Sequence, residues 1–319
     1  MRIATFAAPL SRDGPGLLLR DILRGEDPQL EAIAAAVMEA DADVLVLTDF
    51  DFDLDGLALA AFVDTFDLPY PVQFARQPNA GVATGLDIDG DGRLGDARDA
   101  QGYGRFAGDG GMAILSRYRV DQAGVRDLSD VLWKDLPDAV LPQTPQGPFL
   151  TADVRAGLRL SSTGHWIVPI VLPDGKVVSV LAFDATPPVF DGPEDMNGLR
   201  NRDELRLWES VLDGDYGPPP AGFVIAGNAN LDPLGGQGDR AAMARFLARP
   251  DLTDPQPAVP NADWGPDGPG KLRVSYLLPS VDWQVVGAGV VWPDETEQSE
   301  QTDIGPHMLI WVDIVRLPS

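Results

Sequence analysis

Short apolar runs and a helical apolar pattern alternate in the first part of the chain. Residues 3–6 and residues 44–47 are apolar runs of the length of buried strands. Between them, Asp27 and Pro28 are residue types that begin a helix, with Asp as the capping residue and Pro at the first helical position. The apolar residues that follow recur at helical spacing: Leu30, Ile33, Ala34, Val37 and Met38. A strand, a helix and a second strand in this order predict a layered α/β protein.

The same two patterns continue along the rest of the chain. Further strands are predicted at residues 111–116, 158–161, 177–183, 271–278, 285–292 and 308–314. Helices are predicted at residues 203–212 and 239–248, each with one apolar face. The Pro- and Gly-rich passages at 213–222 and 254–270 fall between elements of one pattern, so we interpret them as loops rather than linkers. We therefore predict a single domain over residues 1–319.

Composition restricts the class of protein. With 319 residues, of which 44% are hydrophobic, the chain can bury a large core. It has no cysteine, which excludes disulfides, thiolate metal sites and cysteine nucleophiles. No apolar stretch approaches the ~20 residues that cross a membrane, and no charged and then apolar leader follows Met1. As written, the sequence predicts a soluble, cytoplasmic protein without a membrane partner, or a secreted protein if a signal has been trimmed.

The charge of the chain bears on its partners. There are 49 acidic against 24 basic residues, a net charge of −25. Nucleic-acid affinity comes largely from Lys and Arg that neutralise phosphates, so this balance disfavours DNA or RNA as a partner. A small phosphorylated ligand or a protein partner stays open, and the sequence does not indicate an oligomeric state.

One polar loop has the composition of a calcium site. Residues 87–92 read Asp-Ile-Asp-Gly-Asp-Gly, and alternating carboxylates followed by Gly match the first half of a calcium-binding loop. The second half differs, because position 12 of such a loop would be Arg98 instead of a bidentate Glu. Two interpretations stay open: a Ca²⁺ site made by Asp87, Asp89 and Asp91, or an Asp/Gly surface turn.

A second polar cluster follows a buried strand. The apolar run at residues 222–226 is stopped by Gly227, and a strand there would deliver Asn228 and Asn230 to the edge of a sheet. The stretch resembles the Gly-Asp-x-Asn signature of the endonuclease/exonuclease/phosphatase superfamily, with Asn228 in place of Asp. Further stretches carry the same resemblance: Trp-Lys-Asp-Leu-Pro at 133–137, Ser-Ser-Thr-Gly-His-Trp at 161–166, Thr-Pro-Pro-Val-Phe-Asp-Gly-Pro-Glu-Asp at 186–195 and Leu-Arg-Val-Ser-Tyr-Leu-Leu-Pro-Ser at 272–280.

This resemblance covers nearly the whole chain. It implies a four-layer α/β/β/α sandwich, in which two mixed β-sheets are flanked by helices and the active site lies at one end. Members of the family hydrolyse phosphate esters with one or two Mg²⁺- or Mn²⁺-class ions. That reaction needs a carboxylate for the hard metal and an Asp that activates water. It also needs an Asn and a His that stabilise charge on the phosphoryl oxygens.

Several of these family positions carry other residues here. The resemblance implies the following replacements: Ala7 for Asn, Asp49 for the metal-binding Glu, Asp184 for His, Asn228 for the water-activating Asp, Ser275 for the Asp before Tyr276, and Pro306 for the Asp of the terminal Asp-His pair. Asn230 and His307 keep the family's residue types. A carboxylate at Asp184 would repel a phosphate, and Asn228 cannot take a proton at neutral pH.

Two main hypotheses follow. In the first, the chain is a catalytically impaired phosphoesterase-like protein, a binding pseudoenzyme, because losing one acid or base group alone costs roughly 10²–10⁴-fold. In the second, it is an active divalent-metal-dependent phosphoric ester hydrolase with a rebuilt site made of Asp49, Asp184, Asn230 and His307. A third hypothesis is a calcium-stabilised interaction module built on residues 87–91.

The site residues expected from this comparison fall into two groups. The catalytic candidates are His307, Asn230, Asn228, Asp184 and His165. For His165, a polar residue lining the site and a histidine at the edge of the core are both open. The candidate ligands of Mg²⁺ or Mn²⁺ are Asp49, Asp184 and Asn230.

Overall fold

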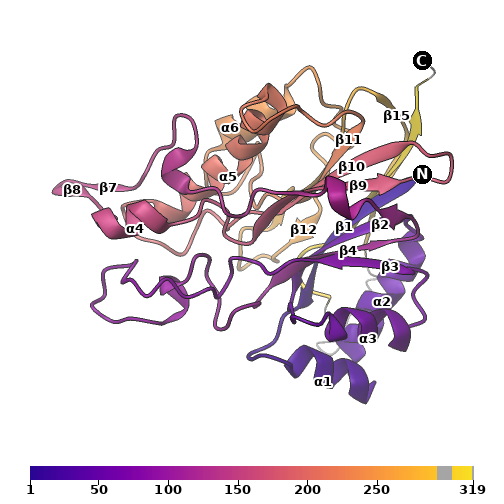
Figure 1. The fold of residues 1–319 in the computed structure, drawn as a ribbon, viewed down its shortest axis with the longest axis horizontal. Helices are drawn as coiled ribbons and strands as arrows, with labels where there is room; N and C mark the ends of the chain where they lie inside the picture. The colour runs from indigo at the N-terminus through magenta and orange to yellow at the C-terminus, as the bar shows by residue number, and fades with distance from the viewer. Residues whose placement is uncertain (293–303, 318–319) are drawn as a thin grey trace.

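Two mixed β-sheets pack face to face, and helices cover their outer faces. The computed structural model describes residues 1–292 and 304–317 (Figure 1). In Figure 1 the layers follow one another from α5 and α6, through the two sheets, to α1, α2 and α3. This arrangement confirms the expected α/β/β/α sandwich. The prediction of a single domain over residues 1–319 stays a prediction.

The first sheet contains the first and the last strand of the described chain, which pair with each other. Its six strands have the order β15-β16-β1-β2-β4-β3. They are β15 (Trp283–Val291), β16 (Leu309–Arg316), β1 (Arg2–Leu10), β2 (Val44–Phe50), β4 (Gly111–Ser116) and β3 (Val72–Ala75). β1 is parallel to β2 and antiparallel to β16, so the sheet is mixed.

The second sheet is also mixed. Its strands have the order β14-β11-β10-β9-β5, and β6 pairs with β9. They are β14 (Ser275–Pro279), β11 (Phe223–Asn228), β10 (Val177–Asp184), β9 (Gly164–Val171), β5 (Arg119–Val120) and β6 (Arg126–Asp127). The parallel pair is β10 and β11, with Asp184 opposite Asn228. Two small hairpins lie outside the sheets: β7 (Gln143–Thr144) with β8 (Gly147–Pro148), and β12 (Ala262–Asp263) with β13 (Lys271–Leu272).

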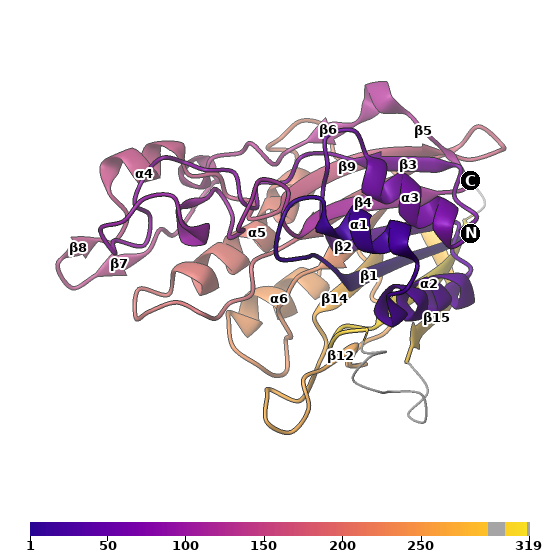
Figure 2. The ribbon, with the colours of Figure 1, turned by 90° about the horizontal axis from the view of Figure 1, so that it is seen from below.

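Helices cover both outer faces (Figure 2). Those packed on the first sheet are α1 (Leu17–Arg24), α2 (Pro28–Ala40) and α3 (Leu57–Thr65). Those on the second are α5 (Met196–Asp213) and α6 (Arg240–Leu247), and α4 (Ala152–Gly157) packs beside α5. Three short 3₁₀ helices are η1 (Ala97–Asp99), η2 (Gln122–Gly124) and η3 (Trp133–Asp135). Within the described residues, no helix is long and apolar enough to cross a membrane.

The core of the sandwich has three parts: one between the two sheets, and one between each sheet and the helices on its outer face. Between the sheets, residues such as Val46, Ile114, Trp166 and Val180 are fully or almost fully buried. Separate apolar clusters lie under the helices of each outer face. The burial of both faces of each sheet explains why central strands such as β2 and β11 are continuous apolar runs in the sequence.

Most predicted elements are found, and the differences have physical causes. Asp27 caps α2 by accepting from the Gln29 N–H at 2.9 Å, as predicted. The strand expected at 158–161 is wrong: apart from an isolated bridge at Arg159, this segment is a loop whose carbonyls accept from side chains. The helix expected at 203–212 begins earlier, at Met196. Its first turns were not predicted because they bury polar side chains, which interrupt the apolar pattern.

Candidate functional site

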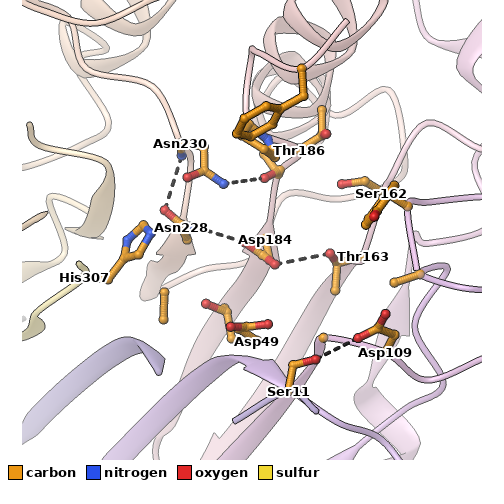
Figure 3. Close-up of a pocket in the computed structure, with 18 of the residues that line it drawn as sticks. Ser11, Asp49, Asp109, Ser162, Thr163, Asp184, Thr186, Asn228, Asn230 and His307 are labelled. Atoms are coloured by element: carbon orange, nitrogen blue, oxygen red, sulfur yellow. Dashed lines mark hydrogen bonds between the residues drawn. The ribbon is translucent and has the colours of Figure 1, made fainter. Parts of the chain in front are cut away.

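A cavity of about 600 Å³ opens where the two sheets meet (Figure 3). Because β1 is parallel to β2 and β10 is parallel to β11, the carboxyl ends of each pair lie at one edge of their sheet. The cavity brings together most of the residues predicted for the site. They are Asp49, Asp184, Asn228, Asn230 and His307, with Ala7 beside them.

Asp49 enters the cavity from a local irregularity in β2. The pairing of β2 with β4 shifts in register between Thr48 and Phe50, and Asp49 has a φ of 62°. A bulge of this kind redirects a side chain, and a left-handed backbone at a residue other than Gly is strained and is common at functional sites. Burial, followed by the negative charge of Asp184, raises the pKa of Asp49 to about 8.

Asp184 and Asn228 form a hydrogen-bonded pair at the ends of β10 and β11. The Asn228 amide Nδ2 donates to Asp184 Oδ1 at 3.2 Å, and the Thr163 hydroxyl donates to Asp184 Oδ2 at 3.2 Å. Burial, with the nearby charge of Glu204, raises the pKa of Asp184 to about 7. Asn228, where the resemblance implies a proton-accepting Asp, is therefore a hydrogen-bond donor to a carboxylate.

Asn230 connects the same two strand ends. Its amide Nδ2 donates to the Ala185 carbonyl at 2.8 Å, and its backbone N–H donates to Asn228 Oδ1 at 3.3 Å. Its φ of 51° is also left-handed. The side chains of Asn228 and Asn230 are thus already engaged within the protein (Figure 3).

His307 lines the cavity without the partner that would orient it. Its Nδ1 is buried and has no hydrogen-bond partner among the described residues, and neither does the buried hydroxyl of Ser275. Both lie on segments held by Asn261, which donates to the Ser275 carbonyl and accepts from the Met308 N–H. Burial lowers the pKa of His307 to about 4, so its imidazole is neutral at pH 7.

His165 does not line this cavity, so its interpretation as a polar lining residue is wrong. It is fully buried on β9, with Nδ1 2.6 Å from the Ser161 hydroxyl and Nε2 3.0 Å from the Glu204 carbonyl. Its ring packs between Phe183 and Trp208. Burial lowers its pKa to about 3, so it is a neutral core residue. No strand was predicted over Gly164–Val171, and the sequence pattern could not indicate that both ring nitrogens of His165 find partners.

Several polar residues of the cavity wall were not predicted from the sequence. Thr163 and Ser162 lie in the motif at 161–166, which was the available signal for them. Ser11 donates to Asp109 at 2.7 Å at another part of the wall. Arg105 at the rim pairs with Asp13 and is half exposed. No sequence motif pointed to these rim residues, because they lie on loops that are brought together only by the fold.

The acidic loop is a separate feature with a different geometry from the one predicted. Carboxylate oxygens of Asp87, Asp89 and Asp99 lie within 4.8 Å of one another, and a second such group consists of Asp89, Asp91 and Asp96. Asp99 is 2% exposed and accepts from the backbone N–H groups of Ile88 and Gly95. Position 12 of the usual calcium loop corresponds to Arg98 here, so the carboxylate of Asp99 lies one residue later than in that loop. A Ca²⁺ site here stays a prediction.

The donor chemistry of the main cavity fits a hard divalent cation. Burial raises the pKa of both Asp49 and Asp184, and the charge of Asp184 raises that of Asp49 further, while the charge of Glu204 does so for Asp184. A divalent cation would relieve their repulsion, and oxygen ligands are those that Mg²⁺ and Mn²⁺ prefer. Figure 3 shows Asp49, from the first sheet, facing Asp184 from the second. These two residues would hold the ion.

The fold is shared with several solved structures. One is an endonuclease/exonuclease/phosphatase from Beutenbergia cavernae, 16% identical, which covers 99% of this chain and 71% of that chain with a TM-score of 0.58. Another is sphingomyelinase C from Streptomyces griseocarneus, 18% identical, which covers 98% of both chains with a TM-score of 0.54. A third is a family protein from Leptotrichia buccalis, 13% identical, which covers 99% of both chains with a TM-score of 0.55. At these identities the likeness shows the fold alone.

Sequence comparison assigns the family. No curated protein has a significantly similar sequence. The sequence model of the endonuclease/exonuclease/phosphatase family, however, matches residues 19–296, which is most of the chain. With its sheets, its cavity and this match in agreement, the chain belongs to the endonuclease/exonuclease/phosphatase family.

Proposed function

We propose that this protein binds a phosphorylated ligand together with a Mg²⁺- or Mn²⁺-class cation, and that its hydrolysis of phosphate esters is strongly impaired. The observation that carries the proposal is the hydrogen bond from the Asn228 amide to Asp184. At the position of the family's water-activating base, this chain has a donor that cannot accept a proton, and the donor is bound to a carboxylate.

The surroundings of His307 support the same conclusion. A histidine that stabilises a developing phosphoryl charge needs a partner that fixes its ring orientation and tautomer. Here Nδ1 of His307 and the hydroxyl of Ser275 both lack a partner within the described part of the chain. Pro306, directly before His307, offers neither a carboxylate nor a backbone N–H. A neutral imidazole with no hydrogen-bond partner at Nδ1 to fix its tautomer would contribute little to transition-state stabilisation.

The carboxylates that the proposed binding of a cation and a phosphate requires, in contrast, are present. Asp49 and Asp184 would hold a divalent cation, which supplies the positive charge that attracts a phosphate. One structural neighbour is a sphingomyelinase C, and the matching family comprises endonucleases, exonucleases and phosphatases, all of which fits a phosphorylated ligand.

Two measurements test the proposal together. In thermal melting, Mn²⁺ should raise the Tm of the wild type, because an ion that binds the folded state stabilises it by RT ln(1 + [L]/Kd). The shift should disappear in Asp49→Ala. Assays of phosphomonoesters and phosphodiesters with Mn²⁺ should show turnover at background. Turnover that vanishes in Asp49→Ala would contradict the proposed impairment, and a Tm that responds to neither Mg²⁺ nor Mn²⁺ would contradict the proposed binding.

One observation favours a second candidate, the active hydrolase with a rebuilt site. The pKa of Asp184, raised to about 7, lies where a general base works best near neutral pH. In that case Asp184 takes the role that Asn228 cannot fill. Asp184→Asn would then abolish the rate while leaving Mn²⁺ binding by Asp49 measurable.

A further inference from the structure

A second cavity adjoins the first. Its volume is about 610 Å³, similar to that of the cavity around Asp49. The two share four lining residues: Tyr103, Thr186, Pro187 and Phe190. Its walls come from the long loop before β4, from the segment between β10 and α5, and from the first turns of α5. A ligand in the first cavity therefore borders directly on the second.

Two exposed aromatic side chains stand at the boundary between the cavities. Phe190 is 79% exposed and Tyr103 is 64% exposed. Phe190 also has a φ of 70°, a left-handed backbone that is unusual for a bulky residue. Strained conformations of this kind cluster at ligand-binding sites. An aromatic ring kept in water at the border of a polar cavity is placed to contact a ligand that spans both.

The charged side chains of the second cavity are already engaged. Asp191 accepts from the Asn197 N–H, and Glu194 accepts from the Gly192 N–H at 3.0 Å. Arg98 lies 3.9 Å from Asp89. The fifth charged residue, Arg200, is buried and donates to backbone carbonyls, among them that of Leu160 at 2.8 Å.

The apolar side chains of the second cavity are what remains for a ligand. They are Ile88, Ala100, Tyr103, Phe149, Phe190 and Met196. Burial against such side chains favours an uncharged apolar group, because each square ångström of apolar surface removed from water contributes favourably and the charged side chains of the cavity already have partners within the protein.

We propose that the second cavity is a subsite for the uncharged apolar part, an aromatic ring or an alkyl chain, of a ligand whose phosphate occupies the cavity around Asp49. Phe190 and Tyr103 determine this specificity. The proposal rests on the proposed binding function, and it adds the chemical class of the group attached to the phosphate.

Calorimetric titration with Mn²⁺ present tests the subsite. The ligands are inorganic phosphate, 1-naphthyl phosphate, hexyl phosphate and phosphocholine, so that a ring, a chain and a cation are compared on the same phosphate. We expect 1-naphthyl or hexyl phosphate to bind the wild type about tenfold or more tightly than inorganic phosphate, the gain expected from burying a group of side-chain size. Phe190→Ala and Tyr103→Ala should each remove most of this gain, so that the affinity for the apolar esters falls toward that of the same variant for inorganic phosphate.

Leu234→Ala is the matched control, since Leu234 is 70% exposed and lines neither cavity. It should leave the affinities for all four ligands unchanged. Equal affinity of the wild type for inorganic and naphthyl or hexyl phosphate would overturn the subsite, and so would tighter binding of phosphocholine than of the apolar esters. A wild type that binds no phosphate at all would overturn the proposed function, and the subsite with it. The two failures are thereby distinguishable.

Discussion

The two histidines of this chain show how differently two neighbouring regions are built. His165 belongs to a buried network in which both ring nitrogens have partners and Glu204 accepts from the Ser162 and Thr186 backbones. His307 lines the same cavity as Asp49 and Asp184, whose pKa values are raised, and its Nδ1 has no partner among the described residues. The first region is a satisfied scaffold that positions the cavity wall. The second holds two carboxylates whose charged forms are disfavoured by burial, and a histidine nitrogen without a partner among the described residues.

The largest expected effect is on the scaffold. In Glu204→Ala, the Ser162 N–H, the Ser162 hydroxyl and the Thr186 N–H would lose their common acceptor inside the core. Each buried donor left without a partner costs about 1–3 kcal/mol, so we expect a loss of roughly 3 kcal/mol or more in the free energy of unfolding. Urea denaturation at pH 7 measures it. Glu204→Gln, which keeps an acceptor oxygen, should lose less, and equal losses in the two variants would contradict the role of the acceptor.

The cavity should behave in the opposite way. The pKa of Asp49 is raised to about 8 in the folded state, far above its ordinary value of 3.8. Between these two values the folded state binds more protons than the unfolded state, so the stability of the metal-free protein should fall as pH rises from about 4 to about 8. Asp49→Asn should flatten this dependence.

At pH 8, Asp49→Asn should therefore stabilise the metal-free protein, by about 1–2 kcal/mol. Denaturant titrations of both proteins at pH 5 and pH 8, with a chelator present, measure the difference. A metal-free wild type that becomes more stable across this range would show that Asp49 is not held at a cost to stability. Asp55→Asn is the control, because Asp55 is an exposed loop residue. Asp53 is not suitable as a control, because its carboxylate accepts hydrogen bonds from the first turn of α3.

The acidic loop gives a smaller expected effect. If Ca²⁺ binds among Asp87, Asp89 and Asp99, it should raise the Tm by a few degrees, equivalent to about 1 kcal/mol. Replacing Asp89 and Asp91 by Asn should remove this shift and leave the response to Mn²⁺ unchanged. A Ca²⁺ shift that survives the double replacement, or that disappears in Asp49→Asn instead, would rule out a site in this loop.

The smallest effect is expected at Ser275. Its buried hydroxyl has no partner among the described residues, so Ser275→Ala removes an unsatisfied group. The free energy of unfolding should change by less than about 0.5 kcal/mol or should rise slightly. The contrast with Glu204→Ala is the test: a loss of several kcal/mol at Ser275 would show that its hydroxyl is bound to a group that stabilises the fold.

Many elements could be predicted from the sequence because burial leaves a simple pattern, although β9, which is also buried, was not predicted. β11 is a continuous apolar run that ends at Gly227, where an added Cβ would meet the Phe183 carbonyl oxygen at 1.9 Å. The resemblance carried by the surrounding motifs then predicted that Asp184 and Asn228 meet. The segment at 158–161 failed, because its backbone groups bond to Asn79 and Arg200, which are distant in sequence. His165 was ambiguous for the same reason, since a buried polar residue is recognised only by its partners.

The central claim is that the cavity has lost the groups that move protons and orient the phosphate, while its scaffold remains. The most direct test is a comparison of Mn²⁺-dependent phosphodiester hydrolysis by the wild type and by a variant that carries Asn228→Asp, Ser275→Asp and Pro306→Asp and keeps Asp49 and Asp184. We expect the wild type to turn over at background and the variant to gain at least about 10²-fold, the contribution of one acid or base group. A wild type that hydrolyses the ester with Mn²⁺, and a variant that is no faster, would contradict the account.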